Sequence, residues 1–308
     1  MCIRDRYYGS NYEFRDITNG YFGYWHCFGS ASHECFSWLD YGKEGDQIMN
    51  AIGILVIILF VLMVVVGRIQ GVKAFLGLVC NFFAIFILII LINWQFNAYI
   101  VTAIISVIIL AVAIYLGSDN IEVTNIAFKT SVIVVAILMA LSIILQYFGQ
   151  FQGFTTENSE ELEGLSLTVG LSFSDIAMVV MVISVLGAVA EAAMAISADL
   201  NEVIERSPDM TGTSLYAHSR IIGGQILGTA INTLFFGVLG ANIPLLIWFV
   251  RLHYPVAMFV NAKLLMTEIV TMLLGMLGIL LSIWIASWFI VRTNVKQQKV
   301  RIKHERDI

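Results

Sequence analysis

Charged residues and prolines are both scarce in this sequence. Only 13% of the 308 residues are charged and three are proline, whereas soluble proteins carry about a quarter charged residues. Hydrophobic residues make up 59% of the chain, so the composition indicates a protein that lies in lipid. The net charge of -5 argues against a nucleic-acid-binding protein, which needs a clustered excess of Lys and Arg.

Motifs of common enzyme classes are also missing after Met49. There is no HExxH, no GxxxxGK[ST] and no GxSxG, the motifs of zinc proteases, phosphate-binding loops and serine hydrolases. His218 and His253 lie far apart in the apolar part of the chain, and neither has a cysteine beside it. We therefore expect a protein that is not an enzyme and needs no cofactor.

Cysteine and histidine do come together near the start of the chain, in an HC…HxC pattern. His26, Cys27, His33 and Cys35 have a spacing that can hold zinc. The alternative is that this segment is not native protein, and we favour it, so we predict no metal site. Cys80 is then the single cysteine that remains, which excludes a disulfide framework.

The segment 1–48 differs in composition from the rest of the chain. MCIRDR resembles a sequencing scar rather than a signal peptide, because no apolar run follows it. Lys43-Glu44-Gly45 can be encoded as a ribosome-binding site before Met49, and the codons of Met49 and Asn50 contain a stop in a shifted frame. We expect 1–48 to be a non-native leader of out-of-frame upstream sequence, with Met49 as the true start.

From Met49 onward the chain is a series of long apolar runs. A helix needs about 20 residues to cross a bilayer core, and hydrocarbon leaves backbone groups no partner outside a helix. We predict an all-α transmembrane bundle over 49–291 with about seven spans. The predicted spans are 51–67, 74–93, 98–117, 131–148, 176–198, 222–240 and 267–291.

Basic residues in the short loops predict the orientation of these spans. Loops rich in Lys and Arg stay in the cytoplasm, which places Arg68, Lys73, Lys129 and Arg206 inside. The acidic connection 149–175 then lies outside, and the basic tail 292–308 is cytoplasmic. This arrangement makes 242–263 a re-entrant or interfacial segment, with an eighth span as the alternative.

Two of the predicted spans carry polar residues that recur every three or four positions, and so share one helix face. On 176–198 these are Ser184, Gly187, Glu191, Ala195 and Ala198; on 222–240 they are Gln225, Gly228, Thr229 and Asn232. Gly224 and Gly228 form a GxxxG motif, which permits close approach of helices. We expect Gly187, Gly224 and Gly228 to pack helices together, and the two polar faces to satisfy each other.

Glu191 is the central candidate, and it has two interpretations. A buried carboxyl has a raised pKa, so Glu191 is suited to bind a proton or a cation. Alternatively it is a packing residue that bonds Asn232 or Thr229. Glu268, near the start of the last span, is a second candidate acid; Gln225, Thr229 and Asn232 either bond between helices or line a path.

Three stretches of the chain carry a family resemblance. They are GRIQG at Gly67–Gly71, the block GLSLTVGLSFSDIAMVVMVISVLGAVAEAAMAISADLNEV from Gly164 to Val203, and GTAINTLFFGVLGANIPLLIWF from Gly228 to Phe249. In these the chain resembles the YibE/F-like family of bacterial integral membrane proteins. The family has an aspartate where this chain has Glu191, and its NTL motif matches Asn232-Thr233-Leu234.

The resemblance implies an architecture and a partner more than a reaction. Members have several spans, and in Gram-positive bacteria they occur as two adjacent related genes, which implies a paralogous subunit encoded upstream. We therefore expect a multi-pass protein of the bacterial cell membrane, in contact with lipid and that subunit. Its role is either that of a permease-like subunit or that of a non-transporting subunit that serves assembly.

Overall fold

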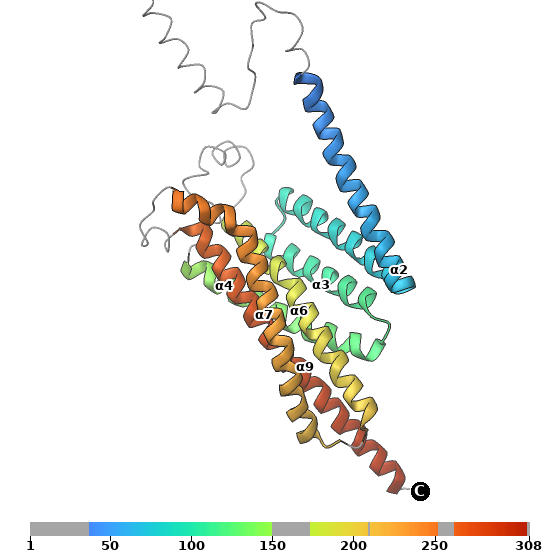
Figure 1. Cartoon of the computed structure of the whole chain (residues 1–308). Coiled ribbons are helices and arrows are strands. Elements are labelled where there is room, and N and C mark those ends of the chain that lie inside the picture. The colour runs from blue at the N-terminus through green and yellow to red at the C-terminus, as the bar shows by residue number, and fades with distance from the viewer. Residues whose placement is uncertain (1–36, 150–172, 209, 252–261, 307–308) are drawn as a thin grey trace, which may run out of the picture. The chain divides into compact units, whose positions relative to one another are not determined.

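The structure is a computed structural model, and it describes residues 37–149, 173–208, 210–251 and 262–306. These residues form six helices and no strands, and all six helices are long and apolar enough to cross a membrane. Figure 1 shows them in chain order from α2 to α9. The chain divides into two compact units, Met1–Val61 and Leu62–Ile308, and the packed helix bundle lies in the second.

Helix α2 (Ser37–Asn93) has a break in its helical geometry at Arg68. Arg68 has a φ of 49° and a ψ of -127°, a left-handed φ that residues with side chains rarely adopt. A Cβ added to Gly71 would collide with the backbone carbonyl of Met63. Residues eight positions apart in a straight helix are about 12 Å apart. The chain therefore turns sharply at Arg68, and Gly71 is required there because it has no side chain.

The arm of α2 that follows Arg68 is joined to the turn after α3 (Ala98–Gly117) by polar contacts. Lys73 Nζ lies 2.5 Å from Asp119 Oδ1, and Gln70 Nε2 donates to the carbonyl of Gly117 at 2.9 Å. Farther along the arm, Gly77 lies against the side chain of Leu116. The bend in α2 and the α3–α4 turn therefore lie at the same end of the bundle.

Asparagines start the next two helices. The side chain of Asn97 accepts bonds from the backbone N–H groups of Tyr99 and Ile100 at the start of α3. Asn120 does the same for Glu122 and Val123 at the start of α4 (Ile121–Gly149). Asparagine is among the best residues for this position. Because the connection between them is short, α3 and α4 run antiparallel and pack against each other.

Helix α6 (Phe173–Arg206) is the centre of the bundle. It packs against α3, α4, α7 (Gly212–Arg251) and α9 (Lys263–Arg306). Met181, Val185 and Val189 of α6 are almost fully buried in a cluster that includes Ile105 of α3 and Leu138 of α4. A second, smaller cluster joins α6, α7 and α9 near the chain's tail and consists of Ile196, Leu200, Leu215, Ala286 and Ile290.

Helices α7 and α9 lie side by side along the bundle (Figure 1). Their contact is close because glycines remove side chains from it: a Cβ on Gly223 would lie 2.6 Å from Ile283 Cγ2. Pro244 lies inside α7 and cannot donate a bond to the carbonyl of Gly240. The helix nevertheless continues to Arg251, as proline-containing membrane helices do when neighbouring groups compensate.

The all-α architecture is confirmed, and the predicted spans fall inside the observed helices. The bounds of 98–117 agree with α3, whereas the helices that contain 131–148, 176–198 and 222–240 are longer. The reason is that polar residues outside the hydrocarbon core continue a helix that hydropathy alone would end. Residues 242–251 are the end of α7, so a re-entrant or interfacial segment does not begin at 242; residues 252–261 lie outside the described part.

Candidate functional site

Glu191 lies on the exposed face of α6. Ser184, Gly187 and Ala198 are exposed on the same face, as their spacing predicts, and we call these four residues the α6 stripe. The positions between them, such as Val189 and Ala193, are fully buried. The most deeply packed helix of the bundle therefore leaves one polar, small-residue strip uncovered.

A similar strip runs along α7. Gln225, Gly228, Thr229 and Asn232 are all exposed, and we call them the α7 stripe. The Thr229 hydroxyl lies 3.3 Å from the Gln225 carbonyl and 3.1 Å from that of Ile226, so it donates within its own helix. Such back-bonding satisfies the hydroxyl without a second helix.

The described residues do not bring the two stripes together. Near the stripes α6 and α7 meet through Ile196 and Gly223. A helix turns about 100° per residue, so Ile196 points about 140° away from Glu191 and Gly223 points about 180° away from Asn232. Both stripes therefore face away from this contact, and no hydrogen bond joins Glu191 to Asn232 or Thr229 in the described part of the chain.

The glycines predicted to pack helices do not do so in the described structure. A Cβ added to Gly187, Gly224 or Gly228 would have no atom within 4 Å. The close contacts occur instead at Gly223, Gly275 and Gly278. The Gly275 and Gly278 pair, three positions apart on one face of α9, is a sequence signal that could have identified this contact. The sequence does not show whether Gly223 or Gly224 makes the close contact, because it does not show which face of α7 points inward.

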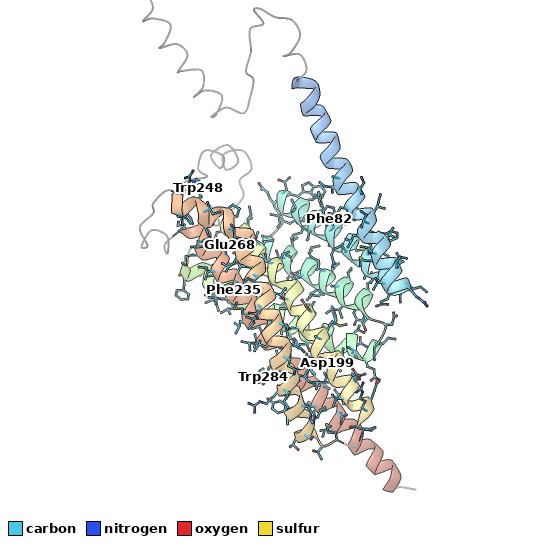
Figure 2. All side chains as sticks on the ribbon, viewed as in Figure 1. Phe82, Asp199, Phe235, Trp248, Glu268 and Trp284 are labelled. Atoms are coloured by element: carbon cyan, nitrogen blue, oxygen red, sulfur yellow. The ribbon has the colours of Figure 1, made fainter. Side chains whose placement is uncertain are left out.

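Glu268 is half-buried near the start of α9, where Figure 2 labels it. Gly278 of α9 lies against Val189 of α6, which sets the relative height of the two helices. Counting from that contact at 1.5 Å per residue, Glu268 is about 18 Å from the level of Glu191 along the bundle axis. The two candidate acids therefore do not form one site.

Two hydrogen bonds tie α6 to its neighbours at the end where α6 begins. Tyr99 Oη donates to Asp175 Oδ1 at 2.8 Å, and Gln146 Nε2 donates to Ser174 Oγ at 2.6 Å. Sequence reasoning assigned Asp175 only to an acidic outer connection and did not detect this role. The signal was present, since tyrosine, glutamine and serine all occur at the predicted helix ends on that side.

No group of three or more His, Cys, Asp and Glu residues in the described ranges is placed to hold a metal ion. His26, Cys27, His33 and Cys35 lie outside those ranges. The α6 stripe therefore offers one carboxyl, that of Glu191, and the α7 stripe offers two amides and one hydroxyl. Such groups can bind a proton or a hydrated cation, or hydrogen-bond another polypeptide.

Comparison with known protein families identifies the family of this chain. The family model described as YibE/F-like protein matches residues 55–295, so the chain belongs to that family. The match includes every described candidate residue, from Ser184 to Glu268. No curated protein and no solved structure matches the chain.

Proposed function

We propose that this YibE/F-like chain is a permease-like subunit, in which Glu191 lies beside a path for a small solute or ion that a second subunit completes. The observation that carries the proposal is the exposure of Glu191 in the apolar part of α6. Even on insertion-based scales an acid at the centre of a membrane helix costs about 2.5–3.5 kcal/mol. A carboxyl on an outward face therefore needs water, an ion or a polar partner.

The α7 stripe supports the same proposal. Gln225 and Asn232 expose amide groups on the side of α7 that points away from Gly223. Amides at this depth are costly against lipid and favourable beside a hydrated path or another polar helix. Two polar faces that both point outward are expected of a subunit that is completed by a partner, and the paralogue encoded upstream is our candidate.

We further propose seven crossings, with the tail 292–308 in the cytoplasm of a bacterial cell. The apolar part of α2 runs over 43 residues from Ala51 to Asn93, about twice the length that one crossing needs, and it bends at Arg68. The contacts of Lys73 and Gln70 with the α3–α4 turn, and of Gly212 with Val295, support placing these basic turns and the tail on one side. By the positive-inside rule that side is cytoplasmic.

A second candidate is a non-transporting assembly subunit. The open space at Gly187, Gly224 and Gly228 favours it, because small residues on an exposed helix face let the backbone of another helix approach closely. In that case Glu191 bonds the partner and does not titrate during function.

The test is ion-flux and current measurement on proteoliposomes that hold the chain with its upstream paralogue, over a panel of ions. Replacing Glu191 by Gln keeps size and hydrogen bonding but removes the charge. We expect Glu191→Gln to abolish flux, a loss of at least about tenfold, because a neutral amide cannot exchange a proton or attract a cation.

The matched control is Glu122→Gln, since Glu122 is an exposed acid in the first turn of α4. It should leave flux unchanged. Full flux in Glu191→Gln would exclude a titrating role for this residue. If no ion moves although the pair is assembled, while Gly187→Leu releases the paralogue, the assembly subunit is the correct choice.

A further inference from the structure

A groove runs between α7 and α9, on the side of α7 that carries Gly223 and Gly224. Its volume is about 430 Å³, and it is open to the surroundings of the protein. Figure 2 labels Trp284, one of its residues, beside the α7–α9 pair. The groove is lined by Tyr216, Ser219, Arg220, Gly223, Gly224 and Leu227 of α7, and by Leu280, Ile283, Trp284 and Ser287 of α9.

Two adjacent glycines shape the groove. At Gly223 the two helices are in contact, since an added Cβ would lie 2.6 Å from Ile283 Cγ2. This contact closes the bottom of the groove. At Gly224 an added Cβ would meet nothing within 4 Å, so the absence of a side chain leaves open space in the groove. One glycine therefore brings the helices together, and the next keeps the space between them open.

Arg220 gives the groove its charge. It is exposed, and no ion pair or hydrogen bond is found for its guanidinium among the described residues. By contrast, Arg206 pairs with Glu202 and Lys73 pairs with Asp119. Donors in the lining include the Arg220 guanidinium, the Tyr216 hydroxyl and the Trp284 indole N–H, and no carboxylate lines the groove. Such a set suits an anion, and phosphate above all.

The Arg220 end of the groove also lies towards the headgroups of one leaflet. Trp284, Trp288 and Arg292 follow one another at four-residue intervals towards the end of the apolar run of α9, and the Arg292 guanidinium lies 4.9 Å from the centre of the Trp288 ring. Tryptophan is enriched where a membrane meets water. Side chains of a helix lean towards its N-terminus, so Arg220 leans towards the start of α7, at the same end.

From these observations we infer that the groove is a binding site for an anionic phospholipid of the leaflet on the side of the chain's tail. The guanidinium of Arg220 pairs with the phosphate, and Tyr216 and Trp284 donate to the headgroup oxygens. The acyl chains lie along Gly224, Leu227 and Leu280. One uncompensated cation selects a lipid with net negative charge over a zwitterionic one. The inference does not depend on the transport proposal.

The experiment is native mass spectrometry of the full chain in detergent, titrated with phosphatidylglycerol, phosphatidylcholine or soluble glycerol 3-phosphate. We expect tight binding of phosphatidylglycerol, weaker binding of phosphatidylcholine and none of glycerol 3-phosphate. Arg220→Gln should raise the apparent Kd for phosphatidylglycerol about tenfold, which corresponds to the loss of one charge-assisted hydrogen-bonding group. Its affinity for phosphatidylcholine should change much less.

Arg251→Gln is the matched control, because Arg251 is an exposed arginine at the opposite end of the same helix. It should leave the Kd unchanged. Gly224→Leu, at a position with open space, should weaken both lipids by filling the groove. An unchanged preference for phosphatidylglycerol in Arg220→Gln would overturn the inference, as would equal binding of the two lipids by the unaltered chain. Binding of glycerol 3-phosphate as tight as that of the lipid would identify a free-phosphate site instead.

Discussion

Helices α6 and α7 are neighbours of similar apolarity but very different burial. Their most apolar windows have mean hydropathies of 2.3 and 2.0, yet 61% of the α6 window is buried in the bundle and only 6% of the α7 window. In lipid, apolar side chains gain little from leaving one apolar surrounding for another, so hydropathy does not decide which helix becomes central. Close packing decides it, and the tight glycine contacts of α9 lie against α6 and one side of α7.

The two helices also differ in where their polar groups bond. Ser174 and Asp175 of α6 accept bonds from α4 and α3, whereas Thr229, Thr233 and Asn242 of α7 donate to carbonyls of α7 itself. Helix α6 is therefore fixed by its neighbours. Helix α7 is self-sufficient, and its outward face is free to meet another molecule.

The largest difference should come from removing a buried side chain. Met181 of α6 is fully buried in the main cluster, and Met181→Ala should destabilise the bundle by about 2–5 kcal/mol because the cavity cannot be refilled. Ile221 of α7 is 66% exposed, so Ile221→Ala should cost less than about 0.5 kcal/mol. Unfolding by SDS in mixed micelles measures both. Equal losses would show that α7 is buried as deeply as α6.

A smaller effect is expected from adding a side chain at a glycine. At Gly278 a Cβ would lie 2.8 Å from both Leu138 Cδ1 and Val189 Cγ2, and these side chains are almost fully buried. Gly278→Leu should therefore cost about 1–3 kcal/mol by overpacking. Gly228→Leu, on the open face of α7, should leave the same SDS unfolding curve in place. If Gly228→Leu destabilised the isolated chain, another helix of the same chain would have to pack against the α7 stripe.

The sequence was sufficient to predict the helices and the residues that share a face. The predicted bounds 98–117 agree with those of α3, because its apolar run ends where the helix ends. The spacing of Ser184, Gly187 and Glu191 predicted their common face equally well. Periodicity, however, says nothing about the direction in which that face points. The direction depends on contacts such as Gly278 with Val189, which join residues far apart in the chain.

The bend in α2 illustrates the same limit. The apolar runs 51–67 and 74–93 predict that 68–73 is a polar connection between two spans. The structure keeps the backbone helical on both sides and concentrates the turn at Arg68, with Gly71 against Met63. A hydropathy pattern locates polar residues but does not specify the backbone conformation that joins two apolar runs. The polar ends of α4 and α7 were missed as helix for the same reason.

The smallest effect should come from a single bond that anchors α6. Tyr99→Phe removes the hydroxyl that donates to Asp175 and keeps the ring, so it should cost about 1 kcal/mol in the SDS unfolding measurement, since a carboxylate loses one of its donors. Thr233→Val on α7 removes a hydroxyl that bonds the Thr229 carbonyl in its own helix and keeps the branched shape, so it should be nearly neutral.

Amide hydrogen exchange locates the effect: in Tyr99→Phe the first turns of α6 should exchange faster, while α7 should be unchanged. If Thr233→Val proved as costly as Tyr99→Phe, the hydroxyls of α7 would be bonding something other than their own helix, and the distinction between an anchored α6 and a self-sufficient α7 would fail.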